Sequence, residues 1–267
     1  MGKRILTKDE ENQIIYNYTV LKMSQKNSGA FIKASDKVVK RVLKENNVPI
    51  RTQGESRQKY FIKKDYFLNQ TSNMAYILGL LASDGCVHSS KNLIYIELQR
   101  NDKELLEKVN KELGNTRPVK DYETTKGYLN SKLWFYSQEA KEQLKEYHII
   151  PNKTYSNDFK FPETLKEEFY MDYIRGLFDG DGSIKDSNCS PTWQIDSSSK
   201  DIVENIQQIL LKYNIETKIQ EKQSKNIPLY RIYCYGQEKC QKIYELLYNN
   251  AEIFMIRKKE KFENLLK

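Results

Sequence analysis

Hydrophobic and polar positions alternate with a period of two in two short stretches of the chain. Ile94, Ile96 and Leu98 alternate with polar or amphipathic side chains, and Trp193 and Ile195 do the same further along. This period predicts strands that bury one face. Apolar residues at helical spacing follow each stretch, which predicts an amphipathic helix after each strand. These helix positions are Leu105, Leu106, Val109 and Leu113, and Ile202, Ile206, Ile209 and Leu210.

The same order of predicted elements occurs twice, in residues 74–155 and 171–267. Each copy begins with an apolar helical run and continues, after the amphipathic helix, with a second strand pair and a third helix. The stretch KLWFYSQEAKEQL (132–144) matches RIYCYGQEKCQKIYEL (231–246) in this part. Each copy therefore predicts the order αββαββα, with antiparallel sheets that we expect to be saddle-shaped. The fold class is α+β, with two pseudosymmetric units.

A polar segment, residues 1–70, precedes the two copies and predicts a small helical domain. Residues 8–21 fit one helix, and residues 35–51 fit another that begins at a Ser35 or Asp36 cap. The outer face of this second helix is basic, which is similar to the recognition helix of a helix-turn-helix. The alternative is a solvated basic face without a ligand. The basic residues are Lys37, Lys40, Arg41 and Lys44.

Length and composition fit a folded protein of one large domain or two to three small ones. The chain has 267 residues, of which 39% are hydrophobic and 30% are charged. We expect a helical extension at 1–70, a first unit at 71–160 and a second unit at 161–267. The formal net charge of +8 is by itself a weak indication of a polyanionic partner.

Membrane, secreted and zinc-binding proteins are not favoured by the sequence. No apolar run approaches the ~18 residues that a membrane span needs, and the first residues contain no apolar signal region. We expect a cytoplasmic or organellar protein that is not secreted. The four cysteines form no CxxC pair and the chain has two histidines, so we expect free thiols and no zinc site.

Each unit opens on nearly the same phrase, YILGLLASDG (76–85) and YIRGLFDGDG (173–182). A glycine inside a helix costs ~1 kcal/mol relative to alanine, so its presence needs a compensating contact. Small residues four positions apart leave a flat stripe on which another backbone can approach closely. We therefore expect the two helices to pack against each other around a pseudo-twofold axis. The stripes are Gly79 with Ser83 and Gly176 with Gly180.

Both phrases end on Asp-Gly. Gly85 and Gly182 fit the left-handed position just after a helix, which places Asp84 and Asp181 at helix C-termini, where the dipole disfavours a negative charge. Packing the two helices together would bring both carboxylates to one axis, and a cation there would offset their repulsion. Oxygen ligands without histidine or cysteine favour Mg²⁺. The alternative is that each Asp-Gly is simply a turn.

On these residues the chain resembles the LAGLIDADG homing endonucleases of the single-chain, two-motif kind. The segments ILGLLASDG (77–85) and IRGLFDGDG (174–182) align with the motif without gaps, and the resemblance extends over residues 74–267. The first copy departs from the motif at Ala82, where the second copy keeps the acid as Asp179. Since the later acid is the metal-binding one and is present in both copies, the resemblance does not make Ala82 inactivating.

The resemblance implies a ligand set for a divalent ion. Asp84 and Asp181 would hold Mg²⁺, with help from the backbone carbonyls of Ser83 and Gly180. Mn²⁺ or Ca²⁺ could occupy the same site. This ion would activate water and assist the leaving oxygen in phosphodiester hydrolysis.

Four further residues are implied as active-site groups. Gln99 is the polar residue that positions water near the phosphate, and Asp196 is its expected counterpart. PNKT (151–154) is similar to the lysine-bearing turn of the family and points to Lys153. IRKKEKF (256–262) is the matching stretch and points to Lys258, although Lys259 is adjacent and the register stays open.

The implied substrate is double-stranded DNA with a long asymmetric target, cut once in each strand by a monomer. A two-stranded ribbon fits the major groove, where base edges are distinguishable. Basic residues of the N-terminal helix could add sequence-blind phosphate contacts at one flank. Candidate contacts on the outward sheet positions are Tyr95, Glu97, Lys132, Gln194 and Arg231.

Two other functions are compatible with the motifs to different degrees. A LAGLIDADG-type protein can bind DNA or RNA without cleavage, as an intron maturase or transcription regulator; Ala82 and the N-terminal segment favour this alternative, and the two retained aspartates favour the enzyme. A self-splicing intein is not expected, because the chain has neither a Cys or Ser start nor a His-Asn end.

Overall fold

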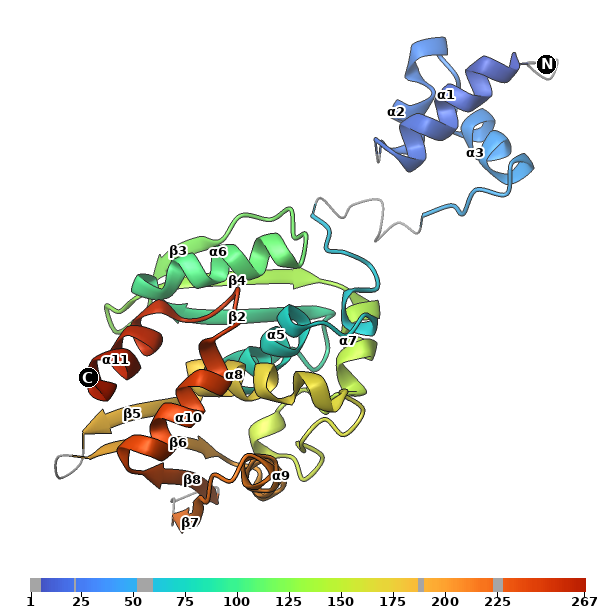
Figure 1. Ribbon diagram of the computed structural model, residues 1–267. Coiled ribbons are helices and arrows are strands. Elements are labelled where there is room, and N and C mark those ends of the chain that lie inside the picture. Colours follow the sequence, from blue (N-terminus) through green and yellow to red (C-terminus); the bar gives the residue numbers. More distant parts are fainter. Residues whose placement is uncertain (1–5, 22, 52–59, 187–189, 223–227) are drawn as a thin grey trace. The chain divides into compact units, whose positions relative to one another are not determined.

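The computed structural model describes residues 6–21, 23–51, 60–186, 190–222 and 228–267 (Figure 1). The chain divides into two compact units, Met1–Lys59 and Tyr60–Lys267. Within the described residues, no helix is long and apolar enough to cross a membrane.

The N-terminal unit is a small helical bundle. A capping box between Thr7 and Glu10 begins its first helix. The elements are α1 (Lys8–Thr19), α2 (Gln25–Ser28), the 3-10 helix η1 (Ala30–Ile32) and α3 (Asp36–Glu45). Ile14 and Tyr18 of α1 pack with the buried apolar side of α3 in a separate hydrophobic core. The opposite side of α3 exposes Lys37, Lys40 and Lys44.

The second unit contains two repeats of the predicted order αββαββα. The first repeat consists of α5 (Ser72–Ser83), β1 (Gly85–Val87), β2 (Leu93–Gln99), α6 (Lys103–Glu112), β3 (Lys120–Glu123), β4 (Leu129–Tyr136) and α7 (Gln138–Lys145). The second consists of α8 (Tyr170–Asp181), β5 (Gly182–Asp186), β6 (Pro191–Ser197), α9 (Lys200–Lys212), β7 (Lys218–Lys222), β8 (Leu229–Tyr235) and α10 (Gln237–Tyr248). A further helix, α11 (Ile256–Leu266), follows the second repeat.

Each repeat forms one four-stranded antiparallel sheet with the same strand order. The orders are β1-β2-β4-β3 and β5-β6-β8-β7. The predicted alternation is confirmed, because Ile94, Ile96 and Leu133 are buried, as are Trp193 and Ile195. The α+β class, the two repeated units and the helical N-terminus are confirmed as predicted.

Residues 60–70 pack with the first repeat rather than with the N-terminal helices. The amide of Lys63 donates to the carbonyl of Leu113 at 2.9 Å. Tyr66 and Phe67, in the 3-10 helix η2 (Tyr66–Leu68), are buried in the core of the second unit. The compact part of the second unit therefore begins ahead of α5.

Helices α5 and α8 lie side by side between the two sheets (Figure 1). A Cβ on Gly79 would overlap the carbonyl oxygen of Tyr173 and lie 2.8 Å from the amide nitrogen of Leu177. A Cβ on Gly176 would overlap the carbonyl oxygen of Tyr76 in the same way. The glycines therefore allow direct backbone contact, which confirms the reason predicted for their place inside helices.

The prediction that Gly85 and Gly182 adopt a left-handed conformation is wrong. Gly182 has φ −78° and ψ 165°, and Gly85 has no positive φ. Each glycine instead begins a strand directly after the helix, and a Cβ would lie 2.6 Å from the carbonyl oxygen of Leu81 or Phe178 in the last turn. Glycine is required there because the chain turns sharply from helix to strand without a loop.

Candidate active site

The two motif aspartates come together where α5 and α8 end. Asp84 is the C-cap of α5, and Asp181 is the last residue of α8. A Cβ on Gly180 would lie 2.8 Å from Asp84 Oδ2 and 2.5 Å from Ser83 Cβ. The carboxylate of Asp84 therefore lies directly over the last turn of the helix that carries Asp181. The small residues at Ser83 and Gly180 are what permit this approach.

One lysine from each repeat reaches this point. Lys153 Nζ donates to the carbonyl oxygen of Gly85, and Lys258 Nζ donates to that of Gly182. Lys258 also donates to the carbonyl of Phe178 at 3.1 Å and lies 3.5 Å from that of Gly180. Each lysine thus binds the glycine that follows one of the aspartates. We call Asp84, Asp181, Lys153 and Lys258 the Asp–Lys quartet.

Of the two adjacent lysines, Lys258 is the one whose side chain reaches the end of α8. Its side chain points into the protein and is 8% exposed. Lys259 instead lies near Glu263, with Nζ 3.8 Å from the carboxylate, and stacks over the ring of Phe254.

Burial and mutual charge perturb all four groups of the quartet. Burial raises the pKa of Asp84, and burial together with the charge of Asp84 raises the pKa of Asp181 to about 6. Burial lowers the pKa of Lys258 to about 8 and also lowers that of Lys153. The opposite charges counteract these shifts in each case. Perturbed carboxylates and amines clustered at one point are typical of a catalytic site.

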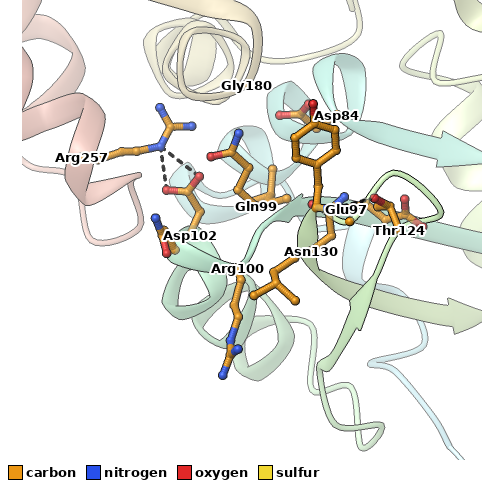
Figure 2. Close-up of a pocket in the computed structure, with 14 residues that line it drawn as sticks. Asp84, Glu97, Gln99, Arg100, Asp102, Thr124, Asn130, Gly180 and Arg257 are labelled. Carbon is orange, nitrogen blue, oxygen red and sulfur yellow. Dashed lines mark hydrogen bonds and ion pairs between the residues drawn. The ribbon is translucent and has the colours of Figure 1, made fainter.

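A cleft of about 770 Å³ opens beside Asp84 and Gly180 (Figure 2). Gln99 lies on its wall. Arg257 also lines it, and its Nε donates to both carboxylate oxygens of Asp102 at 2.8 and 2.9 Å. This ion pair joins the start of α11 to the 3-10 helix η3 (Arg100–Asp102) of the first repeat.

Sequence patterns did not predict Arg257 or Asp102 as site residues. The pair is separated by 155 positions in the chain, and neither residue belongs to the repeated motif. The one indication in the sequence is that Arg257 directly precedes Lys258 in IRKKEKF (256–262), the stretch to which the family resemblance points.

The assignment of Asp196 as the counterpart of Gln99 is wrong. Gly85 pairs with Ile96 in the first sheet, and Gly182 pairs with Ile195 in the second. The residue after each isoleucine is therefore equivalent, which matches Asp196 with Glu97. The spacing misled because the hairpin of the first two strands is longer in the second repeat: Gly85 pairs with a residue 11 positions later, and Gly182 pairs with one 13 positions later.

Four of the predicted DNA contacts and active-site groups are paired with each other on the sheet surfaces. Lys132 forms an ion pair with Glu97, and its ammonium lies 3.6 Å from the ring centre of Tyr95. Arg231 donates from two nitrogens to the two oxygens of Asp196, each at 2.6 Å. These charges stand at equivalent positions of the two sheets, so the pairing itself is pseudosymmetric.

The remaining sheet candidate, Gln194, lies in a second cleft of about 520 Å³ on the surface of the second sheet. Lys185, Gln220 and Tyr233 line the same cleft. In the N-terminal unit, Arg41 Nε lies 3.7 Å from Glu45, whereas Lys37, Lys40 and Lys44 extend outward from α3.

The donor set at the quartet fits a hard divalent cation that keeps part of its water shell. Among the described residues, no three side chains of histidine, cysteine, aspartate or glutamate gather as a metal site. Asp84 and Asp181 therefore offer two carboxylates, and other ligands would come from backbone carbonyls, water and phosphate. Mg²⁺ characteristically binds through one or two carboxylates plus substrate phosphates.

The sequence profile of the LAGLIDADG-like domain family matches residues 71–147 and 168–249. The two matched segments correspond to the two repeats and together span more than half of the chain. The chain therefore belongs to the LAGLIDADG-like domain family, and the predicted resemblance is confirmed.

Individual relatives are distant. An uncharacterized protein of Methanocaldococcus jannaschii is 27% identical over 158 residues, which are 55% of this chain and 54% of that protein, so the chain spans about half of it. The LAGLIDADG homing endonuclease I-LtrWI bound to target DNA is 14% identical, with a TM-score of 0.47, over 76% of this chain and 89% of that chain. Full-length DUF199/WhiA from Thermatoga maritima is 16% identical, with a TM-score of 0.47, over 76% and 64%.

Proposed function

We propose that this protein is a site-specific endonuclease that hydrolyses one phosphodiester in each strand of duplex DNA with the help of a divalent metal ion. The Asp–Lys quartet is the observation that carries the proposal. Two carboxylates suited to a hard cation and two ammonium groups suited to a phosphate meet where two repeats join. Such an arrangement fits a reaction carried out once on each of two antiparallel strands.

The protein groups have separate roles in this proposal. Asp84 and Asp181 would hold Mg²⁺, which would supply Lewis-acid stabilisation and an activated water. Lys153 and Lys258 would stabilise the negative charge that develops on the phosphate oxygens, in a cleft where water is partly excluded. Gln99 and Arg257 line the cleft beside Asp84 and would orient the phosphate and the attacking water.

The two sheet surfaces are the proposed DNA-binding surfaces. Outward side chains on paired antiparallel strands can follow the major groove, where each base pair shows a distinct pattern. Because the two surfaces differ in sequence, the target would be long and asymmetric, and one monomer would cover it. The exposed lysines of α3 would add salt-dependent contacts to phosphates.

Cleavage of a random duplex library tests the proposal without knowledge of the target. The protein is incubated with the library in Mg²⁺ buffer, and cut ends are captured by adapter ligation and sequenced. We expect one extended consensus with staggered ends. Asp84→Asn and Asp181→Asn should abolish cut ends while the same consensus is still retained in a binding selection, because the amide keeps the shape but loses the ligand charge.

Asp158→Asn is the matched control, since it makes the same chemical change on an exposed aspartate away from the helix ends. It should cut like the unmodified protein. Enrichment of one consensus with both strands intact in Mg²⁺ and Mn²⁺ would refute the endonuclease.

That result would support the second candidate, a LAGLIDADG-type protein that binds DNA or RNA without cleaving it. One observation favours this candidate: Lys258 Nζ lies 3.5 Å from the carbonyl of Gly180, an oxygen that the metal would otherwise use. A parallel selection on random RNA would separate a maturase-like binder from a DNA-binding regulator.

A further inference from the structure

Asp179 is a fully buried carboxylate that does not face the cleft. It accepts hydrogen bonds from Tyr76 Oη and Tyr248 Oη, each at 2.8 Å, and from the amide of Met255 at 2.7 Å. These three donors belong to α5, α10 and the residue that caps α11. Burying a carboxylate is costly unless hydrogen bonds compensate it, and here a single side chain joins three elements to α8.

A second polar residue of α8 holds the same region. Arg175 is 2% exposed and donates to the carbonyls of Ile253 and Leu247 at 3.2 and 3.1 Å. Its guanidinium is also paired with Asp172 at 2.7 Å. Asp179 and Arg175 lie four positions apart, so consecutive turns of α8 hydrogen-bond to the connection between α10 and α11.

The first repeat lacks both residues. The matched phrases place Leu78 where the second repeat has Arg175, and Ala82 where it has Asp179. Both of these residues are buried and apolar. Lys153 follows α7 in a 3-10 turn that begins after Asn152, whose φ is +55°. The anchoring therefore belongs to the second repeat alone.

The anchored segment carries Arg257, which lines the cleft, and Lys258, which reaches the ends of α5 and α8. Met255 caps α11, and its carbonyl accepts from the amides of Lys258 and Lys259, both at 3.1 Å. Lys258 and Arg257 stand in this first turn, where a shift of Met255 would move both side chains. Catalytic groups are sensitive to such shifts, because a 1 Å misplacement can cost ~100-fold in rate.

We propose that Asp179 is a positioning residue that fixes Lys258 at the end of α8, beside Asp181, and thereby supports only one of the two strand cleavages. It contacts neither substrate nor metal. This inference rests on the proposed endonuclease function, and it adds that the two cleavages depend on different supports. Loss of Asp179 should convert a double-strand endonuclease into a nicking enzyme.

Strand-resolved cleavage of a supercoiled plasmid that carries the selected target is the first arm of the test. For Asp179→Asn we expect one strand to be cut ~10–100-fold more slowly and nicked circles to accumulate, while the other strand is cut at the unmodified rate. The slowed strand should be the one that Lys258→Met also slows. Tyr248→Phe, which removes one of the three donors, should also slow cleavage of that strand. It replaces Asp179→Asn in the test if that variant folds poorly.

A double-mutant cycle separates positioning from general destabilisation. If Asp179 acts through Lys258, the variant Asp179→Asn/Lys258→Met should be no slower on that strand than Lys258→Met alone. Equal slowing of both strands, or multiplied effects in the double variant, would overturn the inference.

Hydrogen exchange measured without DNA tests the anchoring independently of cleavage. Asp179→Asn should speed amide exchange in residues 253–260 and leave residues 149–156 unchanged. If the unmodified protein cuts no DNA but this difference appears, the endonuclease proposal fails while the anchoring stands. If Asp179→Asn leaves amide exchange in residues 253–260 unchanged, as in residues 149–156, the anchoring is overturned.

Discussion

The two repeats have the same order of elements but support their lysines differently. Lys153 lies in a 3-10 helix of three residues, η4 (Lys153–Tyr155), after α7. Lys258 lies in α11, a helix of eleven residues. The ring of Phe262 in α11 packs 5.7 Å from that of Phe178 in α8. The comparison shows that repeats with a common motif can bring their lysines to equivalent positions through unequal local scaffolds.

The outward sheet surfaces diverge as well. The first carries aromatic side chains over cations, with Arg117 4.7 Å from the ring of Trp134 and 4.0 Å from that of Tyr60. The second adds amides to its aromatic and basic side chains, with Gln194 and Gln220 beside Tyr233 and Tyr235 in its cleft. Buried faces are constrained by packing, whereas these surfaces are free to differ, so the two halves would read different DNA sequences.

The largest expected effect concerns the two lysines. Lys153→Met and Lys258→Met should each slow cleavage by ~10²–10³-fold with a small loss of affinity, because one donor to the developing phosphate charge is removed. Quench-flow or gel assays on the selected target measure this. Lys259→Met is the matched control and should cut normally. A near-normal rate for Lys153→Met would mean that only the second repeat uses its lysine.

A methyl group added to either helix at the crossing of α5 and α8 should lower the stability by the same amount. Gly79→Ala and Gly176→Ala each place a methyl against the opposite backbone, and we expect each to lower the free energy of unfolding by about 3 kcal/mol in urea titrations. Gly127→Ala makes the same change at φ +82°, where the new methyl would meet only Glu123 Oε1 at an ordinary 3.7 Å, and should cost only ~1–2 kcal/mol. A tolerated methyl at one glycine alone would show that the crossing is not symmetric.

Arg257, the neighbour of Lys258, forms an ion pair with Asp102. The contacts described around Lys153 include no corresponding ion pair. Asp102→Asn should lower the free energy of unfolding by about 1–2 kcal/mol, since the carboxylate is buried but the arginine is half exposed. Cleavage of one strand should weaken at the same time. Unchanged stability in calorimetry would mean that Arg257 finds water or another partner.

The smallest expected effects concern the paired charges on the sheets. Double-mutant cycles should give coupling of less than about 1 kcal/mol for Glu97 with Lys132 and for Asp196 with Arg231, because both pairs are partly solvated. The two-point Arg231 pair should couple more strongly than the Lys132 pair. A reversed order in urea titrations would contradict the geometric difference between the sheets.

The repeated phrases made much of the fold predictable. Alternation and helical spacing identified the elements, and the unfavourable glycines predicted the crossing, because these features follow from local sterics and burial. The conformation of Gly85 and Gly182 was not predictable from a helix-capping rule. Their constraint comes from the strand that begins immediately after each helix.

The site was predictable only where the motif is local. Asp84 and Asp181 stand in the repeated phrases, Lys153 and Lys258 were implied by the family resemblance, and the structure brings all four together. The match of Gln99 with Asp196 failed because counting residues does not reveal that the strands of the second hairpin pair over two more residues. The Arg257–Asp102 pair depends on tertiary packing across the two repeats, for which the chain carries no periodic signal.

Backbone contact at the crossing of α5 and α8 also bears on how the protein could diversify. No side chain stands between the helices at Gly79 and Gly176, so no rotamer change or conservative substitution can alter their separation. Mutations on the outward strands would therefore change the recognised bases while the offset between the two cut positions stays constant. Halves taken from different members should form working chimaeras whenever both retain the glycines.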